Sequence, residues 1–522
     1  MVPRGQSMTA VQLDSGRITG LRRDDGVTEY RGIPFAAPPV GALRFRAPQP
    51  VPGWGGERAC DRTALPAWQE KNPVMGVEAI GDDCLALNVW VPEGDGPFPV
   101  MVWLHGGGYV AGSPSQLLYH GARLAASQRV IVVNAAYRLG VWGYGWFRDI
   151  APSLESDSNL GLRDQVAALE WVQRNAGAFG GDPSQVTVFG ESAGGFSVAT
   201  LLATPAADGL FQRAIVQSGA ADMVLMPAEA ARVTALMCEA LPGDGDMAER
   251  LLAAEPRAIV RAQRAALKTA VQRGLRDTTP QYGMVFMPVV DGDLLPRSPI
   301  EAIAAGCARD RALLAGTCRD EYHLFQYAAP FNGGQTIDAL RALDDDAILS
   351  RFRRALPQHG ERAFEIYREA VTPDPARSHL DWFSSMESDR LFRVPTQRLL
   401  DAHHAAGGEA WGYEFTWEVS IFGVPLGACH VVDVPFVFGI TDTPVGELFT
   451  GGGEEAAALS QRVQQCWGNF ARGGSPGWDA WGEAGEAHHF GREAGSGPLL
   501  DPARAALWAD IIPTPATGGD GA

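Results

Sequence analysis

The chain has 522 residues, of which 46% are hydrophobic and 20% are charged, a composition typical of a globular enzyme. Its formal net charge of −18 argues against a nucleic-acid partner, because nucleic-acid binding requires clustered lysine and arginine. No run of about 18 apolar residues occurs, so we expect no membrane span. The seven cysteines include no C-x-x-C pair, which argues against a zinc ribbon and against a thioredoxin-type motif.

The two ends of the chain are expected to lie outside the folded part. Residues 1–7 (MVPRGQS) resemble the remnant of a protease-site tag, and residues 513–522 are expected to be a disordered tail. The segment after Met8 has no apolar stretch of the kind found in signal peptides. Together with an odd number of widely spaced cysteines, this predicts a cytoplasmic protein, with secretion left open if a signal peptide has been removed.

Strand and helix patterns alternate through the first half of the chain. Apolar runs at 100–104, 130–134 and 186–189 predict buried strands, and residues 211–219 and 312–316 predict two more. Between them, apolar residues at 162, 166, 169 and 172 share one face of a predicted helix. Strands that are apolar throughout and alternate with helices indicate an α/β fold with a mostly parallel central sheet flanked by helices.

Two regions depart from this alternation. Residues 226–280 are rich in alanine, arginine and glutamate and have a helical pattern, and residues 336–405 are similar. We predict that both are helical insertions over the active site. The whole of residues 8–512 is then expected to form a single catalytic domain that contains the two insertions.

The motif G-x-S-x-G, which can mark a strained strand-to-helix turn bearing a reactive serine, occurs twice. A nucleophile at such a turn needs a preceding strand, a following helix and a backbone N–H on the next residue. Ser192 follows the strand 186–189 and is followed by Ala193 and an apolar helical stretch. Ser475 is followed by Pro476, which has no N–H. Ser192 is therefore the candidate nucleophile, and Ser475 is expected to be a turn residue.

A glycine-rich loop, His105-Gly106-Gly107-Gly108, directly follows the predicted strand 100–104. Loops of this type supply backbone amides to the oxyanion of a tetrahedral intermediate, and glycine lets the backbone approach the substrate closely. We predict an oxyanion hole formed by the amides of Gly107, Gly108 and Ala193. His105 is expected to have a structural role.

A base and an acid should follow the serine, with the acid first in the chain. His430 lies on a predicted loop after the strand-like residues 411–415 and a short polar loop, and the pair His403-His404 in an alanine-rich helical stretch is its main rival. For the acid, Asp320 and Glu321 both follow the predicted strand 312–315, and position alone leaves the two open.

These motifs belong to a longer pattern that resembles the type B carboxylesterase/cholinesterase family over roughly residues 10–480. The matching segments are RGIPFAAPPVGALRF, GDDCLALNVWVP, HGGGY, NLGLRDQVAALEWV, FGGDP, GESAGG, AIVQSG, PVVDGDLLP, GTCRDE, GACHVVDVPFVFG and WGNFARGGSP. The resemblance implies the α/β-hydrolase fold. It also implies Glu321 as the acid, His430 as the base, Ser218 as a serine near the triad and Glu191 as an acidic neighbour of the nucleophile.

The resemblance further implies a serine carboxylesterase, similar to bacterial members of the family, that hydrolyses carboxylic esters to acid and alcohol through an acyl-enzyme. Its partners would be small-molecule esters, and no cofactor or metal is implied. An amidase and a non-catalytic binding homologue are the alternatives, and monomer and dimer both stay open.

Two departures from the family pattern stand out. Tyr322 follows the acid where glycine is usual, which predicts a tighter local turn. Cys84 matches a cysteine that eukaryotic members bridge to an upstream partner, but Ala67 and Trp68 occupy the partner region here. Cys60 lies several residues earlier, and we do not expect a Cys60–Cys84 bridge.

Overall fold

The computed structural model describes residues 8–72, 77, 79–272, 284–327, 336–375, 377–421 and 423–512. The predicted tag remnant and the predicted C-terminal tail lie outside these residues. Contacts divide the chain into two compact units. Unit 1 comprises Met1–Ile215, Ala221–Ala302 and Gly468–Gly474, and unit 2 comprises Val216–Ala220, Ile303–Trp467 and Ser475–Ala522.

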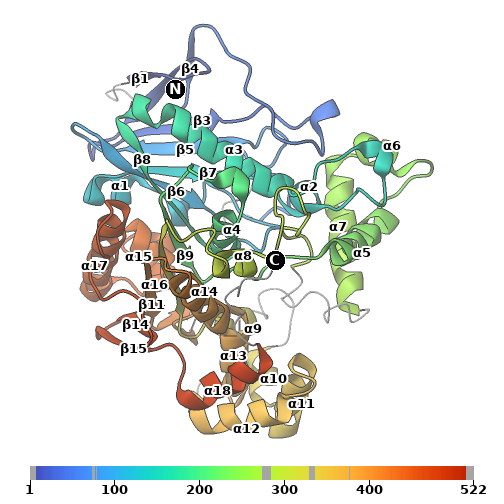
Figure 1. Ribbon diagram of the computed structural model, residues 1–522, viewed down its shortest axis with the longest axis vertical. Coiled ribbons are helices and arrows are strands. Elements are labelled where there is room, and N and C mark those ends of the chain that lie inside the picture. Colours follow the sequence, from blue (N-terminus) through green and yellow to red (C-terminus); the bar gives the residue numbers. More distant parts are fainter. Residues whose placement is uncertain are drawn as a thin grey trace. The chain divides into compact units, whose positions relative to one another are not determined.

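The sheet of unit 1 has the strand order β1-β2-β3-β5-β7-β6-β8 (Figure 1). Its central strands β6 and β7 are buried along their whole length, and β6 runs parallel to both β7 and β8. Uninterrupted apolar sequence is what a strand covered on both faces requires. The outer strands pair antiparallel, and β4 adds to β2. The bounds are β1 Met8–Gln12, β2 Arg17–Arg22, β3 Thr28–Pro34, β4 Glu57–Ala59, β5 Ala86–Val91, β6 Phe98–Leu104, β7 Ile131–Ala135 and β8 Gly181–Glu191.

Unit 1 also contains helices, of which α3 and α4 bury apolar residues. In α3 (Leu160–Asn175) the predicted apolar face is buried, because Leu162, Val166, Leu169 and Val172 are all shielded from solvent. Every residue of α4 (Ala193–Leu202) is buried. The first predicted insertion contains helices α5, α6 and α7. The remaining bounds are α1 Ala122–Gln128, α2 Gly140–Tyr144, α5 Pro227–Ala240, α6 Met247–Ala253 and α7 Pro256–Gln272.

Three elements each contain one point where the chain passes between the units: β9 (Arg213–Gln217), α8 (Pro299–Ala304) and α17 (Gly453–Ala471). In unit 2, β10 (Ala312–Cys318), β11 (Ala410–Phe415) and β14 (Glu486–Phe490) run parallel to one another, and β15 (Gly495–Pro498) pairs antiparallel with β14. The strand at 411–415 and the strand at 312–316 are thus found close to their predicted bounds.

A separate antiparallel pair, β12 (Val419–Ile421) with β13 (Val424–Gly427), lies where the sequence suggested only a short polar loop. Its apolar side chains Val419, Ile421, Val424 and Leu426 are buried. Strands of three and four residues are too short for a period-2 pattern to stand out, which is why the pair was missed.

The second predicted insertion is helical, and a π-helical turn at Asp389–Arg393 separates its last two helices. Figure 1 shows the red α18 beside α12, where Trp508 Nε1 donates to Tyr367 Oη at 2.8 Å. Every helix in the described ranges is too short or too polar to span a bilayer. The bounds in unit 2 are α9 Tyr322–Tyr327, α10 Ile337–Arg341, α11 Asp345–Ala355, α12 Gly360–Ala370, α13 Leu380–Ser388, α14 Val394–Ala405, α15 Val434–Phe438, α16 Pro444–Thr450 and α18 Pro502–Ile511.

Candidate active site

Ser192 occupies the turn between β8 and α4 in unit 1. Its backbone adopts φ 57° and ψ −126°, a conformation that costs a non-glycine residue about 1–3 kcal/mol. The turn is tight because a Cβ on Gly194 would lie 1.9 Å from the carbonyl oxygen of Leu104. Only glycine fits there, so the glycine of the motif permits the close approach of the turn to β6. The half-buried Ser192 is thereby held at the carboxyl end of β8.

The glycine-rich loop lies against this turn. Because β6 and β8 are parallel neighbours with Leu104 opposite Gly190, the loops that follow them leave the sheet together. A Cβ on Gly106 would lie 3.1 Å from Cβ of Ser192. Gly107 is exposed with φ 114°, a value that disfavours any side chain.

The predicted oxyanion donors belong to this loop and to the start of α4. Gly108, with φ 61°, is only partly buried. Ala193 is the first residue of α4, so its N–H has no acceptor within the helix. The positive end of the helix dipole also favours negative charge at this point. Amides so placed can stabilise the oxyanion of an acyl-transfer intermediate.

His105, the first residue of the glycine-rich loop, is held in place by ring stacking and hydrogen bonds. It is 1% exposed, and its ring stacks on Tyr137 with 4.4 Å between centroids. Its Nδ1 lies 2.9 Å from the carbonyl oxygen of Gly106, which can only accept, so Nδ1 carries the hydrogen. The hydroxyl of Tyr137 donates to the carbonyl oxygen of His105 at 2.6 Å. Burial lowers the pKa of His105 to about 4, so this residue stays neutral at neutral pH.

Glu321 and His430 meet in unit 2. Glu321 follows β10 and is fully buried, and His430 follows β13 and is 3% exposed. Glu321 Oε2 lies 2.6 Å from His430 Nδ1, while Oε1 accepts the N–H of Cys318 at 2.8 Å. Because the carboxylate accepts a hydrogen bond from Nδ1–H, neutral His430 has its lone pair on Nε2. This is the tautomer that a general base requires.

The two candidates for the acid have different partners. The carboxylate of Asp320 accepts from the Ala428 N–H and from the Arg319 side chain, each at 2.9 Å, whereas that of Glu321 contacts His430. The rival base His403 is buried within α14, with Nε2 3.0 Å from the carbonyl oxygen of Arg311.

Comparison with known proteins agrees with this arrangement of motifs. A model of the carboxylesterase family matches residues 7–490. The para-nitrobenzyl esterase of Bacillus subtilis (strain 168) is 36% identical over 476 residues, which cover 89% of this chain and 90% of the relative. The chain belongs to the carboxylesterase family. Carboxylesterase 1D of Rattus norvegicus is 32% identical over 478 residues, covering 86% of this chain and 82% of the rat enzyme.

Solved structures of carboxylesterases are similar over nearly the whole chain. A PNB esterase superposes with a TM-score of 0.81 at 32% identity, covering 96% of this chain and 99% of the esterase. A carboxylesterase of Geobacillus stearothermophilus gives 0.82 at 33% identity, covering 96% and 100%. The prediction of the family, the α/β-hydrolase fold and ester hydrolysis is thus confirmed. The protein is a serine carboxylesterase that acts on small-molecule carboxylic esters.

Two residues of this carboxylesterase were predicted to support the triad. Glu191 ends β8 and is 1% exposed, and its Oε2 lies 2.9 Å from where a Cβ on Gly106 would be. Ser218 is fully buried with φ 47°, and its N–H donates to the carbonyl oxygen of Gly316 at 2.8 Å. Their support of the triad stays a prediction.

Sequence analysis missed Asp433, three residues after His430. Asp433 is 1% exposed, and its Oδ2 accepts from Gln217 Nε2 at 2.8 Å and from the Tyr413 hydroxyl at 3.2 Å. Burial raises the pKa of Asp433 to about 6, and the charge of Glu321 adds to the effect, although the two hydrogen bonds oppose it. The one clue in the sequence was an acidic residue inside the otherwise apolar run VVDVPFVF.

Aromatic rings flank His430 within unit 2. The ring centroids of Phe325 and Phe392 lie 5.0 and 4.9 Å from that of the imidazole.

Tyr322, which follows Glu321, begins α9, and its N–H donates to Ser388 Oγ at 2.9 Å. Tyr322 is not among the described residues with positive φ. The backbone after Glu321 therefore adopts no left-handed turn and accepts a tyrosine.

The second G-x-S-x-G motif forms an exposed turn. Ser475 Oγ donates to the carbonyl oxygen of Trp478 at 3.0 Å and accepts the N–H of Gly477 at 3.1 Å.

Within the described ranges, no group of three or more histidine, cysteine, aspartate or glutamate side chains could hold a metal ion.

Proposed function

We propose that this carboxylesterase uses Ser192 as nucleophile, His430 as general base and Glu321 as the acid that orients the histidine. The observation that carries the proposal is the 2.6 Å contact between Glu321 Oε2 and His430 Nδ1, because it leaves Nε2 ready to accept a proton. The strained backbone of Ser192 gives independent support, since such strain occurs mainly at functional turns.

Acylation is the first half of the reaction. His430 Nε2 accepts the hydroxyl proton of Ser192 while Oγ attacks the ester carbonyl carbon. The amides of Gly107, Gly108 and Ala193 donate to the oxyanion of the tetrahedral intermediate, each contributing about 2.7–4 kcal/mol to the transition state. As the intermediate collapses, the alcohol leaves with the proton held by His430, and an acyl-enzyme remains on Ser192.

Deacylation repeats these steps with water as the nucleophile. His430 accepts a proton from the water, the resulting hydroxide attacks the acyl carbonyl, and the same amides bind the second oxyanion. The proton then returns to Ser192 Oγ as the carboxylic acid leaves. The carboxylate of Glu321 stabilises the imidazolium formed in each half. Glu191 and Ser218 support the triad from buried positions.

The surroundings of His430 favour esters with apolar groups. Phe325 and Phe392 present rings to the imidazole, and Phe325 is 38% exposed. Apolar rings beside the reacting atoms favour an uncharged alcohol or acyl group. Para-nitrobenzyl esters are therefore suitable first substrates, in keeping with the name of the Bacillus subtilis relative.

We propose that residues 8–512 act as one catalytic domain. A reducing compartment, the cytoplasm, suits the cysteines. Cys60 and Cys84 are buried, unbridged thiols. Burial raises the pKa of Cys60 to about 11 and that of Cys84 well above its usual range, so both stay protonated and unreactive.

Hydrolysis of p-nitrophenyl acetate, butyrate and octanoate by the wild type and by Ser192→Ala tests the assignment. We expect kcat to fall by about 10⁵- to 10⁶-fold in the variant, because removal of the nucleophile leaves only binding and oxyanion stabilisation. An organophosphonate should label the wild type at Ser192 and leave the variant unlabelled. Wild-type turnover that persists in Ser192→Ala would show that another residue is the nucleophile.

A further inference from the structure

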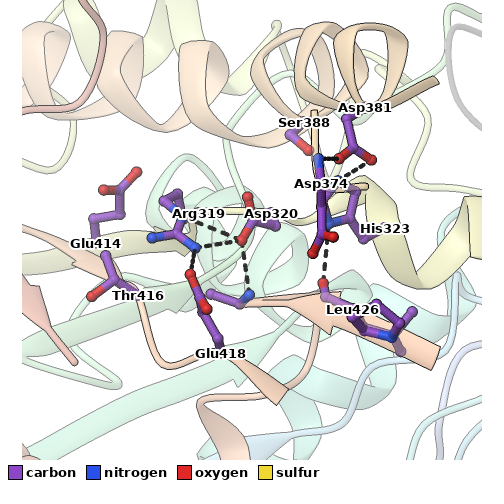
Figure 2. A network of polar contacts seen from close by, with 12 residues as sticks. Arg319, Asp320, His323, Asp374, Asp381, Ser388, Glu414, Thr416, Glu418 and Leu426 are labelled. Carbon is purple, nitrogen blue, oxygen red and sulfur yellow. Dashed lines mark hydrogen bonds and ion pairs between the residues drawn. The ribbon is translucent and has the colours of Figure 1, made fainter. Parts of the chain in front are cut away.

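The loop that carries Glu321 and the loop that carries His430 are joined at several points besides the acid–base contact. We call residues 318–323 the acid loop and residues 426–430 the base loop. Figure 2 shows two of the joints, one from Asp320 to the backbone of the base loop and one from His323 to Leu426. His323 Nδ1 lies 3.1 Å from the carbonyl oxygen of Leu426. The N–H of His430 faces the carbonyl oxygen of Glu321 at 3.4 Å.

Asp320 makes the central contact between the two loops, both as a hydrogen-bond donor and as an acceptor. Its backbone N–H donates to the carbonyl oxygen of Ala428 at 2.9 Å, and its Oδ2 accepts the N–H of Ala428 at 2.9 Å. Asp320 thus binds both the N–H and the carbonyl oxygen of Ala428. Ala428 stands two residues before His430, so this pair of hydrogen bonds fixes the start of the segment that presents the imidazole.

The absence of a side chain at Gly427 leaves room for this contact. Gly427 has φ 62°, and a Cβ built on it would lie 2.4 Å from Asp320 Oδ2. The carboxylate of Asp320 therefore fills the space that a side chain at position 427 would need. The base loop can approach the acid loop this closely only with glycine at that position.

The carboxylate of Asp320 is ionised at neutral pH. Burial raises the pKa of Asp320, but the charges of His323 and Arg319 and the hydrogen bonds from Arg319 and Ala428 outweigh burial and hold it below its usual value. Arg319 Nη2 lies 2.9 Å from Asp320 Oδ2 and 2.6 Å from Glu418 Oε1 (Figure 2). A charged acceptor makes the bond from the Ala428 N–H shorter and stronger than a neutral one would.

We propose that Asp320 is a positioning residue for the esterase reaction, which holds the base loop on the acid loop so that His430 Nδ1 stays in contact with Glu321. The inference rests on the proposed roles of Glu321 and His430. It gives the neighbour of the acid a function of its own, different from that of the acid itself.

The test compares Asp320→Ala with Asp320→Asn in the full-length enzyme, assayed with p-nitrophenyl butyrate. Asp320→Ala removes the acceptor for Ala428, and we expect kcat to fall about 10- to 100-fold, because misplacement of a reacting group by about 1 Å costs this much. KM should stay within about threefold, since substrate binding is not the step affected. Asp320→Asn keeps an oxygen that accepts the Ala428 N–H, and it should recover most of kcat.

Asp501→Ala is the matched control. Asp501 also accepts two backbone N–H groups and pairs with an arginine, but those partners, Ala503 and Arg504, belong to α18. This variant should lower the melting temperature and leave kcat unchanged. Gly427→Ala disturbs the same contact from the base loop and should lower kcat with Asp320 intact. This variant provides a second test if Asp320→Ala fails to fold.

His430→Ala separates failure of this inference from failure of the proposed function. If His430→Ala abolishes turnover while Asp320→Ala and Gly427→Ala keep kcat within about threefold of the wild type, Asp320 does not position the base. A loss of activity in Asp320→Ala that appears as a higher KM with kcat unchanged would also overturn the inference. Full turnover in His430→Ala would overturn the proposed function and the inference with it.

Discussion

The serine region of unit 1 and the acid–base region of unit 2 are positioned by different means. Ser192 is held by backbone geometry, with a positive φ and with glycine at position 194 where the strand β6 lies too close for a side chain. Glu321 and His430 are held by side chains that accept and donate hydrogen bonds, several of them charged. The first region should therefore be sensitive to added volume, and the second to changes of charge and of pH.

The largest effect in this comparison is expected from Glu321→Gln, which removes charge without changing volume. A glutamine cannot stabilise the imidazolium and can hold the wrong tautomer, so we expect kcat to fall about 10³- to 10⁴-fold with little change in melting temperature. Steady-state hydrolysis of p-nitrophenyl butyrate measures it. Glu387→Gln is the control, because Glu387 is also buried in unit 2 but pairs with Arg390 in the turn after α13. Equal activity of Glu321→Gln and the wild type would exclude the charge requirement.

Added volume is tested in unit 1 by Gly194→Ala beside Gly177→Ala. The new Cβ at position 194 would overlap the carbonyl oxygen of Leu104, so we expect a loss of about 1–3 kcal/mol in the free energy of unfolding, together with loss of turnover. Position 177 has no atom within 4 Å of the added Cβ and should tolerate alanine. Urea denaturation and esterase assays measure both. Similar stabilities for the two variants would mean that the turn at Ser192 can relax.

The pH sensitivity of unit 2 is tested with Asp433→Asn. Since the pKa of Asp433 is about 6 in the folded protein and 3.8 ordinarily, the folded state holds a proton that the unfolded chain releases between these values. The stabilisation from this proton is complete below about pH 4 and is lost as the pH rises through 6. Over that interval the wild type should lose up to roughly 3 kcal/mol of unfolding free energy relative to Asp433→Asn. Urea denaturation at pH 4.5 and pH 7 measures it, and a pH-independent difference would contradict the prediction.

Much of the serine region could be predicted from the sequence because its constraints are local. A strand, a glycine motif and a helix follow one another directly, and Pro476 was enough to distinguish the false motif. The strand β8 nevertheless begins at Gly181, five residues before the apolar run that predicted it. Its first residues are polar, and the apolar pattern marks only the buried part of a strand.

The acid–base region was less accessible to such reasoning. The choice between Asp320 and Glu321 depends on which carboxylate faces a residue more than a hundred positions later in the chain, and spacing alone carries no such information. The buried Asp433 was missed for the same reason, whereas the pair β12–β13 was missed because its strands are short. The roles of Glu321, His430 and Asp433 depend on contacts between distant segments, and only the resemblance to a family could supply the pairing of Glu321 with His430.

The positive φ of Ser192 has a consequence for how this enzyme would respond to selection. The turn stores about 1–3 kcal/mol that the rest of the fold must offset. A search for heat resistance alone would reward any replacement that relaxes this turn, with glycine at position 192 as the simplest, and would thereby discard the nucleophile. Laboratory evolution of this protein should couple each heat challenge to a turnover screen, so that tolerance to heat is gained elsewhere in the chain.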